Sequence, residues 1–369
     1  MNALHRVAVQ PAEVESGRYE ILLGSGIWSS LPTILERHAP AHRYAVIADD
    51  RVAELMAVRL ARTLHAAGHR TDVFVFPAGE ANKTRETWAS ISDAMLEAGI
   101  GRDSAVVALG GGVVGDLAGF IAATYMRGLP TVLVPTTLLA MIDASVGGKT
   151  GVDTLTGKNL IGAFHPPRAV VVDPDLLATL PPEHLRTGLA EAIKHGAIAD
   201  EAYLEWIAGA ADRLLAGEAA ALRHLILRSL EIKAEIVARD VREIGPRKAL
   251  NFGHTVGHAL EAASAYDLLH GEAVAIGMVA EARAGERAGI TAAGTSDRLR
   301  RLLGSLGLPT GLPMTLAPEE VLARIGSDKK VRHGRPEYAL PARVGEIALR
   351  DGRFAQPLAD EVVLGALRQ

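Results

Sequence analysis

The sequence predicts an α/β protein of two domains: a parallel-sheet domain over residues 1–175 and a mainly α-helical domain over residues 176–369. The length of 369 residues suits two domains of ordinary size. In the first half, short apolar runs alternate with helical patterns, which is typical of a parallel sheet covered on both faces. In the second half, long helical patterns dominate, and prolines cluster between the halves at residues 173–182.

Short runs that are apolar or rich in β-branched and aromatic residues predict the strands of the first domain. These runs cover residues 44–48, 71–76, 105–109, 131–134 and 169–172. A helical pattern follows the first run through Ala67, and Thr84 can cap a helix that runs to about Ala98.

Good helix formers fill the second half, where residues 210–238 and 271–288 each predict a helix. Short strands are predicted only near the end, at residues 338–340 and 346–349.

Composition excludes several classes of function. Lys plus Arg total 39 against 43 Asp plus Glu, so no basic excess exists to bind nucleic acid. The absence of cysteine excludes disulfides, thiolate metal sites and iron–sulfur clusters. The start of the chain has no apolar signal core, and apolar stretches such as 131–142 are too short to cross a bilayer. We therefore expect a soluble, cytoplasmic protein with no membrane partner.

A glycine-rich turn follows the strand predicted at residues 105–109. Gly110, Gly112 and Gly115 satisfy the pattern GxGxxG, and a helix follows. Such glycines let the backbone approach a pyrophosphate at a helix N-terminus. The alternative is a tight turn that only packs helix against strand. The pattern also comes later in the chain than in a standard dinucleotide fold, where it follows the first strand.

Histidines four residues apart, His254 and His258, lie on one face of a predicted helix. His270 follows, and Glu191 lies on a separate predicted helix. Two or three histidines with one glutamate can hold a divalent metal and leave positions open for water or substrate. The alternative is that these histidines cap helices or bond to backbone carbonyls.

Basic residues occur near turns and glycines. Arg127 ends a predicted helix, Lys149 and Lys158 lie in predicted loops, and Arg247 precedes Asn251 by four residues. Beside a candidate metal site, these cations favour an anionic substrate such as a sugar phosphate. The segment 147–150 is similar to the end of a P-loop, but position 143 is Asp where that motif requires Gly.

Taken together, these segments resemble the 3-dehydroquinate synthase family of sugar-phosphate cyclases. The resemblance covers about residues 19–349 and is most specific at 109–120, 135–159, 188–194, 247–258 and 269–272. It implies an NAD-binding α/β domain followed by an α-helical metal- and substrate-binding domain. It also implies conversion of 3-deoxy-D-arabino-heptulosonate 7-phosphate to 3-dehydroquinate and phosphate, the second step of the shikimate pathway and a carbon–oxygen lyase reaction. The steps would be transient oxidation by NAD+, phosphate elimination, reduction and an intramolecular aldol closure, with zinc or cobalt required.

The resemblance assigns site residues as well. The implied metal ligands are Glu191, His254 and His270. The implied catalytic residues are Lys149, Lys194, Lys233, Glu243, Arg247, Asn251 and His258. The implied substrate-binding residues are Arg127, Asp143, Asn159, Lys329 and Lys330, with Arg127 reaching the site of the partner subunit in a homodimer. The implied NAD contacts are Asp49, Glu80, Lys83, Gly111, Gly112, Val113, Asp116, Thr136, Thr137, Leu139, Lys158, Thr179 and Leu180.

The chain departs from the family pattern in a few places, most clearly at His184, where the family usually has a glutamate. Three alternatives stay open. Another sugar-phosphate cyclase would share the metal and NAD+ but would act on a substrate without a carboxylate. An iron-type polyol dehydrogenase would leave Lys149, Lys158 and Arg247 unexplained. A non-catalytic binding protein on the same scaffold would be expected to lack a metal ligand.

Overall fold

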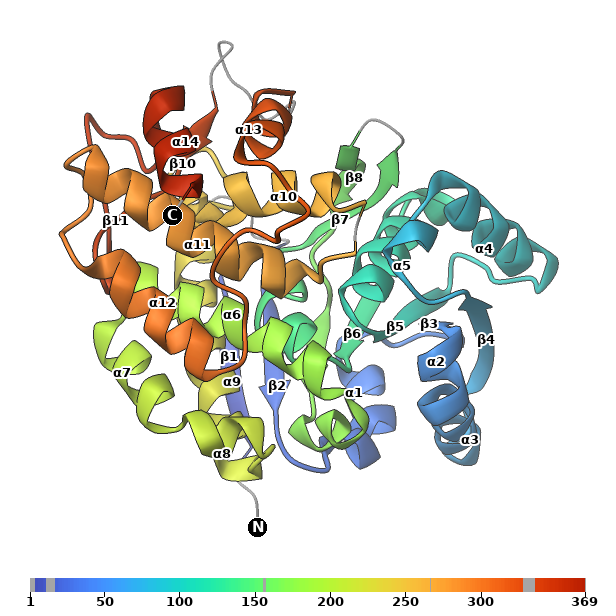
Figure 1. Cartoon of the computed structure of the whole chain (residues 1–369). Helices are drawn as coiled ribbons and strands as arrows, with labels where there is room; N and C mark the ends of the chain where they lie inside the picture. Colours follow the sequence, from blue (N-terminus) through green and yellow to red (C-terminus); the bar gives the residue numbers. More distant parts are fainter. Residues whose placement is uncertain (1–3, 11–16, 155–156, 266, 328–335, 369) are drawn as a thin grey trace. The chain divides into compact units, whose positions relative to one another are not determined.

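The computed structural model describes residues 4–10, 17–154, 157–265, 267–327 and 336–368. The chain divides into two compact units, Met1–Leu180 and Pro181–Gln369. Figure 1 shows a sheet with helices in the first unit and mainly helices in the second. The predicted fold class is therefore confirmed.

A seven-stranded sheet forms the first unit, in the order β1-β2-β9-β6-β5-β3-β4. All neighbouring strands run parallel except β1 and β2, which pair antiparallel. The strands are β1 (His5–Val9), β2 (Tyr19–Leu23), β3 (Arg43–Asp49), β4 (Arg70–Phe76), β5 (Ser104–Gly110), β6 (Thr131–Pro135) and β9 (Ala169–Val172). The sequence analysis did not identify β1 and β2.

Helices cover both faces of this sheet because alternate residues of its inner strands point to opposite sides. On β3, Tyr44 and Val46 belong to one apolar cluster with residues of α1 (Leu31–His38) and α3 (Val58–Ala66). Ala45 and Ile47 belong to the other, with residues of α4 (Arg85–Glu97) and α5 (Gly112–Thr124). The expected cap of α4 is present, since Thr84 Oγ1 accepts a hydrogen bond from Thr87 N at 3.2 Å.

A separate hairpin corrects the two loops that the sequence analysis predicted around Lys149 and Lys158. β7 (Lys149–Thr154) and β8 (Gly157–Phe164) pair antiparallel. A Cβ on Gly162 would lie 2.1 Å from Thr150 O, so the two backbones approach too closely for side chains at that point. Gly151, on the opposite strand, is also close to its partner, since a Cβ placed there would lie 2.7 Å from Ile161 O, so glycine at both positions permits the pairing.

Helices form most of the second unit. They are α6 (Pro182–Ala199), α7 (Glu201–Gly209), α8 (Ala211–Leu215), α9 (Ala219–Arg239), α10 (His254–Ala263), α11 (His270–Arg287), α12 (Thr295–Ser305), α13 (Pro318–Ser327) and α14 (Asp360–Leu367). Two short antiparallel pairs, β10–β13 and β11–β12, accompany them: β10 is Glu337–Tyr338, β11 Pro341–Arg343, β12 Glu346–Ile347 and β13 Gln356–Pro357.

The prediction of a single helix over residues 210–238 is wrong, because the helix is interrupted between α8 and α9. Gly217 adopts a φ of 69° there, in the left-handed region that ends a helix. Among the described residues, none of the helices is both long and apolar enough to cross a bilayer.

Candidate metal centre and nucleotide-binding turn

His254 and His270 are each the first residue of a helix, and close packing between these helices sets their positions. α10 begins after Gly253, whose φ is 79°. A Cβ on Gly253 would lie 2.6 Å from Met278 Cγ, and one on Gly277 would lie 2.0 Å from Gly253 O. Only glycine at both positions lets α10 and α11 approach this closely.

Glu191 lies on α6 and is fully buried. The start of α11 packs directly on this helix, because a Cβ on Gly271 would lie 2.3 Å from Thr187 Cα. Thr187 precedes Glu191 by one helical turn. The contact therefore brings His270 to the same part of α6 as the carboxylate.

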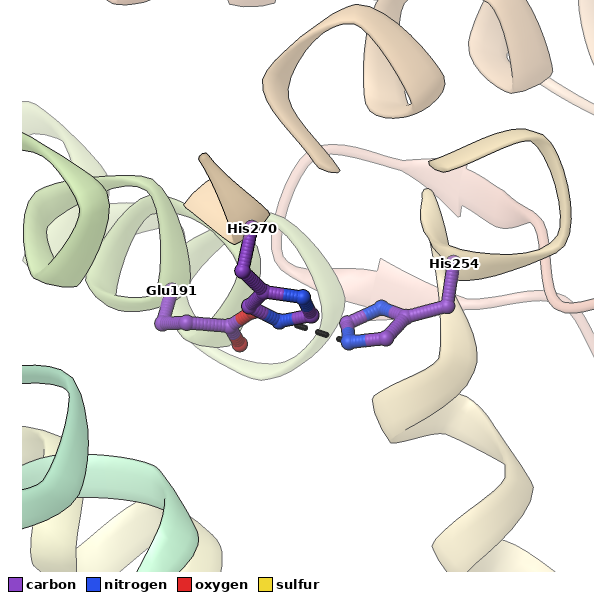
Figure 2. A group of neighbouring side chains, drawn as sticks. All are labelled: Glu191, His254 and His270. Carbon is purple, nitrogen blue, oxygen red and sulfur yellow. Dashed lines mark hydrogen bonds and ion pairs between the residues drawn. The ribbon is translucent and has the colours of Figure 1, made fainter. Parts of the chain in front are cut away.

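The three predicted metal ligands lie together in the structure. Glu191 Oε1 is 3.2 Å from His270 Nε2 and 3.6 Å from His254 Nε2. Figure 2 shows both imidazole rings pointing toward the carboxylate. One donor atom from each residue lies within 4.8 Å of the others, close enough to hold one ion.

The two histidines differ in their pKa values. Burial, together with the positive charge of Lys194, lowers the pKa of His254 to about 3. Burial also acts against protonation of His270, but hydrogen bonds with Glu191 and Glu261 outweigh it and raise the pKa to about 10. Neutral His254 is thus ready to donate a lone pair, whereas His270 must release a proton when a cation binds.

The donor set fits a divalent transition metal. Two imidazole nitrogens and one carboxylate oxygen are the ligands of known catalytic zinc sites, which leave a further position open for water or substrate. The carboxylate is shielded from water and pairs with Lys194 Nζ, so a cation already compensates its charge here. The same donors would suit cobalt.

Several predicted catalytic residues lie around this centre or on the segment that precedes it. The His258 ring centroid is 5.2 Å from that of His254 and 6.3 Å from that of His270. Asn251 Nδ2 donates to Glu243 Oε1, and Arg247 Nη1 donates to Val241 O at 2.7 Å. Lys194 and Lys233 are buried on α6 and α9. Lys329 and Lys330 lie outside the described residues.

Asp240 holds the 240–247 loop in shape, a role that sequence reasoning missed. Its carboxylate accepts hydrogen bonds from the backbone N–H groups of Ile244, Gly245 and Arg247. Glu243 adopts a φ of 59°, a conformation that costs a non-glycine residue free energy and often marks a functional site. The sequence offers little indication of the role of Asp240, because Asp is common in ordinary turns.

Glu281 was also missed, although it lies three helical turns after His270 on the same face of α11. Its buried carboxylate accepts from Gly253 N at 2.8 Å and Val256 N at 3.0 Å. It therefore caps the N-terminus of α10, whose N-cap glycine has no side chain to do so. Burial raises the pKa of Glu281 to about 8, even though these backbone bonds lower it.

We expect Glu281 to make the folded state less stable as pH rises from about 4.5 to about 8. Over that range the unfolded chain releases a proton that the folded chain retains, so the free energy of unfolding falls by up to about 1.4 kcal/mol per pH unit. The measurement is denaturant unfolding of wild type and Glu281→Gln between pH 5 and pH 8. Equal pH slopes for the two proteins would contradict the expectation.

The glycine-rich turn joins β5 to α5, as predicted. Cβ atoms on Gly111 and Gly112 would lie 3.2 Å from Thr137 Cγ2 and 3.3 Å from Ala144 Cβ. Thr136 N donates to Gly110 O at 2.9 Å, which ties the end of β6 to this turn. Gly111, Gly112, Val113, Thr136, Thr137 and Leu139 are therefore neighbours at the carboxyl ends of two parallel strands, where open α/β sheets bind nucleotides.

A cluster of charges forms around the buried side chain of Lys83 and includes the predicted residues Glu80, Asp116 and Lys158. Lys83 Nζ lies 2.7 Å from Glu80, 3.4 Å from Asp116 and 3.5 Å from Asp153. Lys158 Nζ lies 3.5 Å from the same Glu80. Burial raises the pKa of Asp116 to about 6, although Lys83 opposes the shift. Asp153, which sequence reasoning missed, ties the β7–β8 hairpin to Lys83.

The other predicted residues of the first unit are more scattered. Asp49 ends β3 and accepts from Val52 N at 2.9 Å, so it caps the next helix, α2 (Asp50–Val52). Thr179 and Leu180 lie at the end of the unit. Asp143 is half-buried and Lys149 is exposed. Arg127 and Asn159 adopt positive φ values of 70° and 52°.

Comparison with known families and structures gives consistent matches. The family model for the 3-dehydroquinate synthase N-terminal domain matches residues 73–187, and the C-terminal model matches residues 188–331. A 3-dehydroquinate synthase of Symbiobacterium thermophilum is 48% identical over 339 residues, which cover 91% of this chain and 95% of the relative.

Two solved structures are similar along nearly the whole length. A 2-deoxy-scyllo-inosose synthase complexed with carbaglucose-6-phosphate, NAD+ and Co2+ has a TM-score of 0.90, at 25% identity and 99% coverage of both chains. A 2-epi-5-epi-valiolone synthase from Streptomyces hygroscopicus subsp. jinggangensis 5008, with NAD+ and Zn2+ bound, has a TM-score of 0.86. It is 29% identical and covers 95% of this chain and 96% of its own.

Proposed function

The chain belongs to the 3-dehydroquinate synthase family, and from this membership we propose which of its residues carry out the reaction. The enzyme converts 3-deoxy-D-arabino-heptulosonate 7-phosphate to 3-dehydroquinate and phosphate by transient oxidation, phosphate elimination, reduction and aldol closure. Elimination of phosphate breaks a carbon–oxygen bond, so the enzyme is a lyase. The observation that carries the proposal is the cluster that His254 and His270 form with the buried carboxylate of Glu191.

We propose that these three residues hold zinc or cobalt. When bound, the metal supplies Lewis acidity and NAD+ supplies reversible oxidation. Lys194 supports the site in two ways. Its ammonium pairs with Glu191, and its charge helps to keep His254 unprotonated and able to ligate.

The substrate carries a carboxylate and a phosphate, and the proposed contacts are cationic or hydrogen-bonding. Arg247 is buried, and its bond to Val241 O fixes the guanidinium plane. A guanidinium carries its donors in a planar fork whose geometry matches a carboxylate or a phosphate. Asn251, held by Glu243, would bond to substrate hydroxyls, and His258 would bond to substrate or move a proton beside the metal ligands. Lys149, Lys233, Asp143, Asn159, Lys329 and Lys330 complete the proposed set.

NAD+ is proposed to bind along the glycine-rich turn. Gly111, Gly112 and Val113 offer backbone N–H groups at the start of α5, where a helix favours negative charge. Asp49 would accept bonds from ribose hydroxyls, which favours NAD+ over its 2′-phosphorylated form. Glu80, Lys83, Asp116 and Lys158 would line the same region as one charge cluster, with Thr136, Thr137, Leu139, Thr179 and Leu180 nearby.

A homodimer in the cytoplasm is proposed, with Arg127 contacting the substrate phosphate bound to the partner subunit. The positive φ of Arg127 supports a functional role for this residue, because a strained backbone conformation is retained where a side chain must be held in one direction.

Arg127→Ala is expected to raise KM about 10- to 100-fold through loss of one charge-assisted hydrogen bond to the substrate phosphate. Co-refolding Arg127→Ala with Lys194→Ala should then restore partial activity, because one site of the mixed dimer is complete. Lack of rescue would show that Arg127 acts within its own chain.

The function is tested by turnover of 3-deoxy-D-arabino-heptulosonate 7-phosphate with NAD+ and Zn2+ or Co2+. Phosphate and dehydroquinate should form in equal amounts without net NADH. Turnover of glucose 6-phosphate, or of a seven-carbon sugar phosphate without a carboxylate, would instead favour another cyclase. Net NADH from a simple polyol would favour a dehydrogenase. The 48% identity to a 3-dehydroquinate synthase, against 25% and 29% to the other cyclases, favours the first outcome.

A further inference from the structure

A second carboxylate lies behind one of the proposed metal ligands. Glu261, on α10, is 2% exposed, and its Oε1 lies 3.5 Å from His270 Nδ1. The other ring nitrogen of His270, Nε2, lies 3.2 Å from Glu191 Oε1. The imidazole is therefore held between two buried carboxylates, with one at each nitrogen.

The positions of the other two proposed ligands determine which nitrogen of His270 would bind a metal. His254 Nε2 and His270 Nε2 both lie near Glu191 Oε1, so an ion there would take the lone pair of His270 Nε2. A neutral imidazole carries one N–H, which is then on Nδ1, where the Glu261 carboxylate can accept it. Nε2 then presents its lone pair toward Glu191 and His254. A carboxylate in this position also raises the basicity of the ligating nitrogen, which strengthens its bond to a cation.

Glu261 could instead bind an ion directly, because Glu261, His258 and His270 also have donor atoms within 4.8 Å of one another. The distances favour the supporting role. His254 and His270 both direct Nε2 at the same oxygen of Glu191, at 3.6 and 3.2 Å. Glu261 faces the opposite ring nitrogen, which is not available to an ion held on the Nε2 side.

We propose that Glu261 is a positioning residue that holds the proton of His270 on Nδ1 and thereby directs Nε2 to the metal. The inference rests on the proposed metal site and deepens it, since it concerns the strength and geometry of metal binding rather than the identity of the substrate. Glu261 itself would touch neither metal nor substrate.

The test measures Zn2+ affinity by competition with a chromogenic chelator, and the visible absorption of the Co2+-loaded protein. Glu261→Ala is expected to weaken Zn2+ binding about 10- to 100-fold and to change the Co2+ spectrum, with one ion still bound per chain at saturation. Glu261→Gln should lose less affinity, because its amide oxygen still accepts from Nδ1–H. These readouts require no turnover.

Two controls make the outcome decisive. Leu260→Val alters the apolar core beside Glu261 on α10 and should leave Zn2+ affinity unchanged. Glu191→Gln removes a proposed ligand and should weaken binding more than either Glu261 variant. Wild-type affinity in both Glu261 variants, or equal weakening by Leu260→Val, would overturn the positioning role. Loss in Glu261→Gln as large as in Glu191→Gln would make Glu261 a ligand. An unchanged Glu191→Gln would instead overturn the proposed metal site.

Discussion

Replacing His254 with alanine is expected to remove the bound metal and to lower turnover about 10³-fold or more. The side chain contributes one of three donors, and its Nε2 lies 3.6 Å from Glu191 Oε1. Loss of that donor leaves two groups to hold the ion, and Lewis-acid stabilisation of a developing oxyanion is worth several kcal/mol. Metal content of the purified protein and steady-state turnover are the two measurements.

His224→Ala is the matched control for this change. His224 is an exposed histidine on α9 that contacts Trp206, with ring centroids 4.2 Å apart. Its loss should alter neither metal content nor turnover. Full metal content in the His254→Ala protein would show that the ion is held elsewhere, whereas loss of metal without loss of turnover would separate the cluster from the reaction.

Replacing Lys149 with alanine is expected to lower kcat/KM about 100-fold while metal content stays at the wild-type level. One charge-assisted hydrogen bond to an anionic substrate is worth roughly 1.5–3 kcal/mol. Lys149 is exposed at the start of β7, and the backbone around it is fixed, because His165 N donates to Gly148 O at 2.7 Å. The side chain thus projects from a rigid base. Kinetics with the phosphorylated substrate and metal analysis of the same preparation measure both halves of the prediction.

Arg62→Ala serves as the control for Lys149→Ala, since Arg62 is an exposed cation on α3 in the same unit. It should leave kcat/KM unchanged and so separate a specific contact from a general effect of charge. Wild-type kinetics in the Lys149→Ala protein would remove this residue from the substrate site.

The strands and helices of the first unit were largely predictable because they follow local patterns. Continuous apolar runs gave β5, β6 and β9, and Thr84 marked the start of α4 through a cap that depends on nearby residues alone. The β7–β8 hairpin was not predictable. Its close pairing at Gly151 and Gly162 depends on two backbones that meet across a turn, and no apolar alternation marks it.

The metal centre likewise contains some residues that the sequence predicts and others that it does not. His254 and His258 were identified by their spacing on one helix, with His270 and Glu191 as further candidates, and the family resemblance selected Glu191, His254 and His270 as the ligands. The supporting carboxylates Glu261 and Glu281 gave no such signal. Each acts on a partner in another segment, His270 Nδ1 for Glu261 and the N-terminus of α10 for Glu281.

By itself, the sequence determined the residue types that can bind a metal, a nucleotide phosphate and an anionic sugar, together with the order of sheet and helices. Only the tertiary structure decided which donor atoms meet. Glu191 and His270 are 79 residues apart, yet their side chains lie 3.2 Å apart because Gly271 lets α11 rest on α6. The physical reason is that secondary structure follows local periodicity, whereas ligand geometry and buried charge depend on packing between helices that are distant in the chain.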